Sequence, residues 1–277
     1  MVDGENPDFD VDAIVDETLA GVAVRDAGDG TWTGDAPNWF GDRLFGGFVV
    51  SQAIHAATRT APPGTRIHSL HGYFLRAMVA GKDVAYDVRH VRDGRTFSSR
   101  HVTSAQDGAT TFEALCSFTT DTEGYEYQLP LREPVPPPDE LPVQWGPGPW
   151  VMAWVGQTEP DAHGVIASTH RAWMRMGKRL DDDAADHHMH SSLLGFASDV
   201  TGTGGRPRHL GEPGTVGMVS LDHAIWFHRP WRVDEWALYD VTSTVNAGGR
   251  GLLRGTFYSR DGDVIATVAQ EMLLRVV

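Results

Sequence analysis

Cysteine is almost absent from this chain, which has only Cys116 in 277 residues. One cysteine excludes an internal disulfide and argues against a zinc site built on thiolates. Long apolar runs are also missing, because no stretch approaches the about 18 apolar residues that a membrane-spanning helix needs. The acidic first residues lack the positive and apolar regions of a signal peptide. We therefore expect a cytoplasmic protein without a membrane span.

Positive charge is scarce as well. The chain has 23 Lys and Arg against 37 Asp and Glu, which gives a net charge of −14. Such a chain repels a polyanion overall, so nucleic acid is not expected as a partner. A small anionic ligand stays compatible with this charge, because charges more than a Debye length of about 10 Å away are screened.

The common catalytic signatures are missing too. The sequence contains no G-x-S-x-G nucleophile elbow, no P-loop and no dinucleotide-binding fingerprint. His187, His188 and His190 lack the i, i+4 spacing with which helical histidines share a metal ion, so a polar helix entry is the simpler interpretation. We expect neither a metal nor a cofactor.

The most informative feature that is present is a weak internal repeat. Arg76 is followed ten residues later by Tyr86–Val88, and Arg229 is followed ten residues later by Tyr239–Val241. The offset is 229 − 76 = 153 residues, and further along it becomes 261 − 107 = 154 residues for Asp107-Gly108 and Asp261-Gly262. A repeat of this length is one domain-sized unit used twice. We therefore expect the chemistry to lie where two similar halves meet.

Hydrophobic periodicity and turn residues predict the elements of both halves. The expected helices are Asp10–Ala20, Phe48–Ala57 and Asp186–Ser198. The expected strands are Ile67–Leu75, Asp83–Arg92, Thr96–Ala105, Thr110–Thr119, Trp173–Arg179, Met218–His228, Trp236–Asn246, Gly251–Ser259 and Val264–Val276. Each half thus has one buried helix and about four antiparallel strands.

The division of the chain follows from its prolines. The segment Tyr125–Trp150 carries so many that it can form neither a helix nor the interior of a sheet. We predict an N-terminal unit over residues 1–125, a linker over 126–150 and a C-terminal unit over 151–277. The fold class is α+β, with the two sheets joined edge to edge so that edge strands are hidden.

Three polar residues stand in apolar surroundings. Asp199 ends the helix that contains Leu193–Ala197, and Ser220 and Gln270 lie in strands of the second half. Burying these groups is costly unless they bond one another, water or a ligand. The alternative is a purely structural role, with Asp199 as a residue at a helix end and Ser220 and Gln270 as ordinary polar residues in strands. The neighbouring pair Asp222 and His223 points to opposite faces of a strand, so it cannot share one site directly.

These residues lie within motifs that resemble those of the acyl-CoA thioesterase II family of double hot-dog proteins. The matching motifs, in chain order, are Phe45–Gly47 with Gln52-Ala53, His68–Arg76, Arg92–Gly94 with Phe97-Ser98, Leu193–Asp199, Leu221–Pro230 and Gln270-Glu271. The resemblance implies an acyl-CoA hydrolase in which each sheet wraps a long buried helix. It also implies that Asp199, Ser220 and Gln270 hold the hydrolytic water.

The resemblance further suggests where the substrate binds. Gly46 and Gly47 open a helix whose N-terminal N–H groups could stabilise an oxyanion, and His68 and Arg229 are candidate substrate contacts. The phosphates of coenzyme A need cations, for which the second half supplies Arg229, Arg250, Arg254, Lys178 and Arg179. Fused hot-dog pairs commonly associate, so we expect a homodimer or a higher homo-oligomer.

Two other functions remain open. Another hot-dog enzyme, such as an enoyl-CoA hydratase, would use a carboxylate–histidine pair, and a non-catalytic acyl-CoA binding protein would need no catalytic group. Turnover and product analysis separate the three. Because Gln270 corresponds to Cys116 across the repeat, the first half is expected to be structural at that position.

Overall fold

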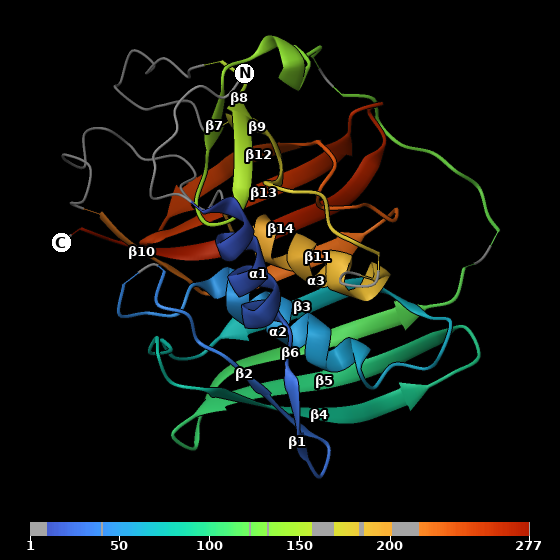
Figure 1. Cartoon of the computed structure of the whole chain (residues 1–277), viewed down its shortest axis with the longest axis vertical. Helices are drawn as coiled ribbons and strands as arrows, with labels where there is room; N and C mark the ends of the chain where they lie inside the picture. The colour runs from blue at the N-terminus through green and yellow to red at the C-terminus, as the bar shows by residue number, and fades with distance from the viewer. Residues whose placement is uncertain are drawn as a thin grey trace.

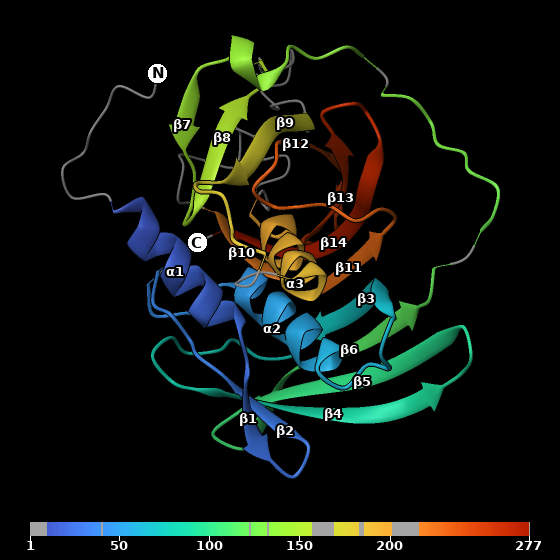
Figure 2. The same ribbon diagram turned by 45° about the vertical axis from the view of Figure 1, so that its right-hand side comes forward.

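One continuous sheet builds most of the molecule. The computed structural model describes residues 10–39, 41–121, 123–131, 133–156, 169–182, 186–200 and 216–276. Within these ranges fourteen strands form a single sheet that curves around two central helices (Figures 1 and 2). No helix in the described ranges is long and apolar enough to span a bilayer.

The first half supplies three layers of this architecture: an outer helix, the inner helix and half of the sheet. Its elements are α1 (Val11–Val22), β1 (Arg25–Gly28), β2 (Thr31–Gly34), α2 (Gly46–Thr58), β3 (Arg66–Phe74), β4 (Val84–Asp93), β5 (Phe97–Gln106) and β6 (Ala109–Thr119). α2 is buried on nearly all sides, as its apolar run predicts. Asp10 caps α1 by accepting the Ala13 N–H at 3.0 Å.

The second half repeats the inner helix and its half of the sheet, and within the described residues it has no counterpart of α1. Its elements are η1 (Pro138–Glu140), β7 (Val143–Trp145), β8 (Trp150–Trp154), β9 (Thr169–Met176), α3 (His187–Ser198), β10 (Val216–Ser220), β11 (Asp222–Phe227), β12 (Ala237–Ala247), β13 (Arg250–Ser259) and β14 (Val264–Val276). The strand order is β1-β2-β4-β5-β6-β3-β11-β14-β13-β12-β9-β8-β7, and β10 also pairs with β14.

The two halves join through β3 and β11, which pair antiparallel. Tyr73 lies opposite Asp222, and Ser69 lies opposite Trp226. Each pair becomes the other when the offset of 153 residues is applied, because 69 + 153 = 222 and 73 + 153 = 226. The repeat is therefore a local two-fold relation at the joint, and the predicted continuous sheet is confirmed.

The central helices lie side by side inside the sheet (Figure 2). A Cβ on Gly195 of α3 would come within 2.5 Å of Ile54 Cδ1 on α2, so the absence of a side chain there permits the close approach. The rings of Phe48 and Phe196 meet edge to face with centroids 4.8 Å apart. The helix interface thus brings the end of α3 close to the start of α2.

The structure differs from the sequence prediction in several regions of the sheet, including the following two. The strand predicted over Met218–His228 is interrupted at Leu221, where the chain passes from β10 to β11. The proline-rich segment is not only a linker, because β7 follows Pro142 and forms the last strand of the sheet. Prolines are tolerated at such an edge because no ladder hydrogen bond is lost there. The boundaries at 125/126 and 150/151 stay a prediction.

Candidate active site

Three polar side chains from distant parts of the second half meet at one point. Asp199 follows the last residue of α3, Ser220 ends β10 and Gln270 lies in β14. The Gln270 Nε2 donates to Asp199 Oδ1 at 2.7 Å and to Ser220 Oγ at 2.8 Å. The structure therefore brings together the trio that the sequence singled out.

The ends of the elements explain how the trio assembles. Asp199 N–H donates to Phe196 O at 3.2 Å, so the last turn of α3 tightens and leaves the Asp199 carboxylate 6% exposed. Ser220 pairs with Met272 in the β10–β14 ladder, two residues beyond Gln270. Gln270 itself is buried between the sheet and α3, at 1% exposure. The end of α3 and the break between β10 and β11 therefore both lie beside β14.

The N-terminus of α2 closes the site from the other half. α2 begins at Gly46 without a side-chain cap, and the Gly47 N–H donates to the Asp199 carboxylate. A Cβ on Gly46 would lie 2.7 Å from Asp199 Oδ2, and one on Gly47 would lie 2.8 Å from Phe196 O. Real Cβ atoms do not approach so closely, so a side chain at Gly46 would displace the Asp199 carboxylate and one at Gly47 would clash with the backbone of α3. The helix start that the sequence analysis singled out thus lies against the Asp199 carboxylate.

Burial dominates the electrostatics of Asp199. It raises the pKa of the carboxyl from 3.8 to about 6, while the hydrogen bonds from Gln270 and from the Gly47 N–H lower it. The positive end of α2 also favours the carboxylate form, yet desolvation is the larger effect. Asp199 is therefore mostly ionised at neutral pH and is a stronger base than an exposed carboxylate.

Asp199, Ser220 and Gly46 line a pocket of about 480 Å³. The pocket is mostly apolar and takes residues from both halves: Leu44, Phe45, Val49, Phe74, Leu75, Ala77, Met78, Val200, Met218, Val219, Leu221 and Met272. Arg43 and Arg76 supply its cations. An apolar pocket with a polar cluster in its wall and two arginines suits an amphipathic anion.

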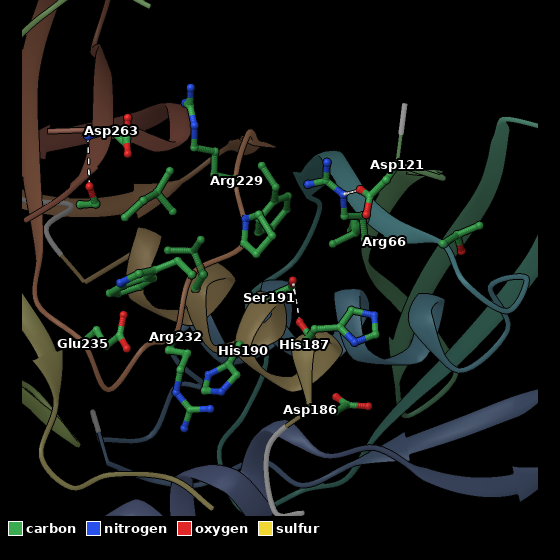
Figure 3. Close-up of a pocket in the computed structure, with 18 of the residues that line it drawn as sticks. Arg66, Asp121, Asp186, His187, His190, Ser191, Arg229, Arg232, Glu235 and Asp263 are labelled. Atoms are coloured by element: carbon green, nitrogen blue, oxygen red, sulfur yellow. Dashed lines mark hydrogen bonds and ion pairs between the residues drawn. The ribbon is translucent and has the colours of Figure 1, made fainter. Parts of the chain in front are cut away.

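A larger pocket of about 770 Å³ takes residues from the start of α3 and the loop after α2 (Figure 3). It is the counterpart of the smaller pocket across the repeat, but it lacks the trio. Ser220 corresponds to Ile67, since 220 − 153 = 67, and Gln270 corresponds to Cys116, since 270 − 154 = 116. Burial raises the pKa of the Cys116 thiol to about 12, so the thiol stays protonated. The larger pocket therefore offers no equivalent chemistry at these positions.

Two residues predicted to contact the substrate lie away from the trio. His68 is bonded through Nε2 to Ser117 Oγ at 2.8 Å and lines neither of these pockets. Arg229 lines the larger pocket, where its Nη1 donates to Val264 O at 3.0 Å. Its counterpart Arg76 lines the smaller pocket, so the two arginines related by the repeat lie in different pockets.

The sequence also missed a cation. The other four candidates for the phosphates of coenzyme A do not line the smaller pocket: Arg250, Arg254, Lys178 and Arg179. The Arg250 guanidinium instead pairs with Glu271 at 3.0 Å. Arg43 lines the pocket, and its position two residues before the Phe45–Gly47 motif was the signal that could have identified it.

Both halves of the chain match known proteins. Residues 35–119 match the family described as acyl-CoA thioesterase N-terminal domain, and residues 150–273 match the acyl-CoA thioesterase family. The chain is 31% identical over 272 residues to acyl-coenzyme A thioesterase 8 of Homo sapiens, covering 84% of this chain and 81% of that protein.

Solved structures agree with these matches. The crystal structure of an acyl-CoA thioesterase II from Mycobacterium marinum has a TM-score of 0.80 and 32% identity, over 97% of this chain and 99% of that one. A hot-dog protein of unknown function from Alicyclobacillus acidocaldarius has a TM-score of 0.74 and 21% identity, over 93% and 97% of the two chains. The predicted double hot-dog fold is thereby confirmed, and the chain belongs to the acyl-CoA thioesterase II family of hydrolases.

Proposed function

We propose that this enzyme hydrolyses acyl-CoA thioesters to a free acid and coenzyme A, using a water molecule that Asp199 activates and that Ser220 and Gln270 position. The observation that carries the proposal is the Gln270 amide, which bonds both partners in the wall of an apolar pocket. Both N–H groups of Gln270 are used in this way. Ser220 Oγ therefore accepts from Gln270 and keeps its own proton to donate.

The chemistry follows from this arrangement. The Asp199 carboxylate takes a proton from water while the water oxygen attacks the thioester carbonyl carbon. The electron pair of the carbonyl moves to its oxygen, which backbone N–H groups at the start of α2 stabilise, with Gly46 the nearest residue lining the pocket. Collapse of the tetrahedral intermediate breaks the carbon–sulfur bond, and the leaving thiolate takes the proton from Asp199. A thioester is already activated, so this route needs no covalent nucleophile.

The pocket accounts for both ends of the substrate. Its apolar wall is suited to an acyl chain, and Arg43 and Arg76 are suited to the phosphates of coenzyme A. These two arginines offset the overall charge of −14 only locally. Free coenzyme A should therefore compete with the substrate, and the competition should weaken as ionic strength rises.

The test is a thiol-release assay with product analysis. The wild-type protein should release free thiol from acyl-CoA and should hydrate no enoyl-CoA. Ser220→Ala should lower kcat by about 10- to 100-fold because the water loses a positioning partner. Ser191→Ala is the matched control, because Ser191 lines the larger pocket and bonds His187 O at 2.9 Å.

The outcomes separate the alternatives. Hydration without thiol release would favour a hydratase, and binding without turnover would favour a non-catalytic acyl-CoA binding protein. Equal activity of Ser220→Ala and Ser191→Ala would remove Ser220 from the mechanism. The homodimer and the cytoplasmic location also remain proposals, which sedimentation and fractionation address directly.

A further inference from the structure

His223 lies directly behind the proposed catalytic amide. In the β11–β14 ladder Ala224 lies opposite Ala269, so the next position places His223 opposite Gln270. Both side chains are buried, at 0% and 1% exposure. Side chains that are opposite each other on the same face of an antiparallel pair are in contact range. His223 is therefore a neighbour of Gln270 on the side away from the pocket.

The two side chains each have one polar atom left over. The two N–H groups of Gln270 donate to Asp199 and Ser220, so its Oε1 is the atom that these bonds do not use. His223 Nε2 lies 2.8 Å from Ser198 Oγ, which leaves its Nδ1. Gln270 Oε1 and His223 Nδ1 are both buried, and neither atom has a hydrogen-bond partner in the described part of the chain. A buried acceptor without a donor is costly, so these two atoms satisfy each other only if Nδ1 carries a proton.

The protonation of His223 can be worked out from its surroundings. Burial lowers the pKa of His223 to about 4, against the interaction with Gln270, so the ring is neutral at pH 7 and carries one proton. With that proton on Nε2, the bare Nδ1 would face the Gln270 oxygen. With it on Nδ1, His223 donates to Gln270, and the Ser198 hydroxyl donates to Nε2. Ser198 Oγ also lies 2.7 Å from Gly195 O, so the single hydroxyl proton of Ser198 can be donated either to Gly195 O or to His223 Nε2.

We propose that His223 is a positioning residue, whose Nδ1–H holds the Gln270 amide in the orientation that presents Nε2 to Asp199 and Ser220. This inference rests on the proposed hydrolytic function. Without that donor the amide can rotate, and a reversed amide would put its oxygen against the Asp199 carboxylate. His223 thereby acts on Asp199 through Gln270, without touching the substrate.

Among the described residues, burial and hydrogen bonds account for the pKa shifts of Asp199 and His223, and no nearby charge is among the causes. α2 contributes only Gly46 and Gly47 at the carboxylate, and the Tyr239 phenol of β12 donates to Ser198 O at 2.8 Å. Asp222 precedes His223 on β11, and Glu271 follows Gln270 on β14. Neighbouring residues of a strand point to opposite faces, so these two charged side chains point away from His223 and Gln270. A change at His223 can therefore reach Asp199 through Gln270 or through Ser198, the residue that precedes Asp199. His223→Asn separates the two routes, because it keeps a donor near Nδ1 and removes the Nε2 contact with Ser198.

The first test is the tautomer itself. Long-range proton–nitrogen correlation spectra of the wild-type protein with labelled histidine should show a neutral His223 ring with the proton on Nδ1, assigned by loss of its signals in His223→Asn. A ring with the proton on Nε2 would overturn the proposal. This measurement needs no variant to be active.

The second test separates positioning from packing. His223→Asn keeps a donor near the position of Nδ1 and should retain kcat within about 3-fold, whereas His223→Leu should lower kcat about 10- to 100-fold with little change in KM. In His223→Leu the acid limb of kcat/KM should also move up by about half to one pH unit, because Asp199 loses a well-oriented hydrogen bond. His190 is a buried histidine on α3 that lines the larger pocket, and His190→Leu should leave this limb in place.

The result distinguishes this inference from the function on which it rests. If Asp199→Asn retains turnover in the same assay, the hydrolytic mechanism fails. If Asp199→Asn is inactive while His223→Leu keeps the wild-type kcat and acid limb, only the role of His223 fails. Equal impairment of His223→Asn and His223→Leu would likewise contradict a role for the donor. Should His223→Leu not fold, the tautomer measurement decides.

Discussion

At the scale of single residues, the site depends on one buried carboxylate, whose pKa is set by two opposing effects. Burial raises the pKa of Asp199 to about 6, against the hydrogen bonds from Gln270 and Gly47. Compared with the 3.8 of an ordinary aspartate, ionising this group costs the fold about 3 kcal/mol. The raised pKa nevertheless favours catalysis, because a general base works best when its pKa lies near the working pH.

The pH dependence of the enzyme should report this pKa. As pH falls through about 6, Asp199 becomes protonated and can no longer accept a proton from water. We expect kcat/KM for acyl-CoA to fall about tenfold per pH unit below that value, measured by thiol release between pH 4.5 and 8 in a buffer series of constant ionic strength. An acid limb near pH 4, typical of an exposed carboxylate, would contradict the burial argument.

The stability of the folded state should change with pH in the direction opposite to that of the activity. A folded-state pKa raised above the unfolded value means that the native state binds the proton more tightly. The destabilising contribution of Asp199 is thus complete above about pH 6 and disappears as pH falls toward 4. Replacement by asparagine should therefore leave the Tm at pH 7 unchanged or raised.

Gly46 offers a test of the approach between α2 and Asp199. The added Cβ of Gly46→Ala would lie 2.7 Å from Asp199 Oδ2 and 3.3 Å from Phe74 Cζ, so the carboxylate must shift. We expect kcat to fall by about 10- to 100-fold, because displacement of a catalytic group by about 1 Å has effects of this size. Gly124→Ala, which meets nothing within 4 Å, is the matched control and should behave as wild type.

At the scale of secondary-structure elements, the contact between α2 and α3 sets the position of the trio. Gly195→Ala would place a Cβ 2.5 Å from Ile54 Cδ1, which should destabilise the fold by about 1–3 kcal/mol. Ile54→Val removes that same Cδ1 atom. The double variant should therefore recover part of the stability lost by Gly195→Ala, measured by urea unfolding. Simple additivity of the two changes would show that the helices do not meet there.

Sequence patterns identify some elements better than others. α2 and β3–β6 were predictable, because an apolar run and alternating strands reflect burial on one or both faces. The break at Leu221 was not, because β10 and β11 are both apolar and only pairing with a third strand reveals the shift. The hairpin of β1 and β2 was also missed, since each strand has only four residues and β1, at the sheet edge, is exposed along its whole length and so shows no alternation.

The candidate site shows the same division. Asp199, Ser220 and Gln270 could be identified because they are polar residues in apolar segments within recognisable motifs. The start of α2 was identified as a candidate site for oxyanion stabilisation, but its contact with Asp199 depends on helix packing, which the sequence does not reveal. Arg43 and Arg76 come from the first half, and a search for cations around the trio in the second half could not reveal them.

At the scale of the whole molecule, the site needs both halves. The trio comes from the second half, while the α2 N-terminus and the two arginines come from the first. Separation at β3 and β11 would expose two strand edges and the apolar faces of both helices. We expect fragments 1–125 and 126–277 to be unstable or aggregated, as judged by circular dichroism and sedimentation. A monomeric fragment 1–125 that unfolds cooperatively would contradict this.

The most direct test of the central claim is the turnover of Asp199→Asn. The change keeps the size of the side chain and removes the proton acceptor, so kcat for thiol release should fall by about two to four orders of magnitude while KM changes little. Asp222→Asn is the matched control, because Asp222 Oδ1 accepts the Glu271 N–H at 2.7 Å and lies outside the pocket. It should retain activity within a few-fold. Wild-type turnover by a normally folded Asp199→Asn would contradict the account.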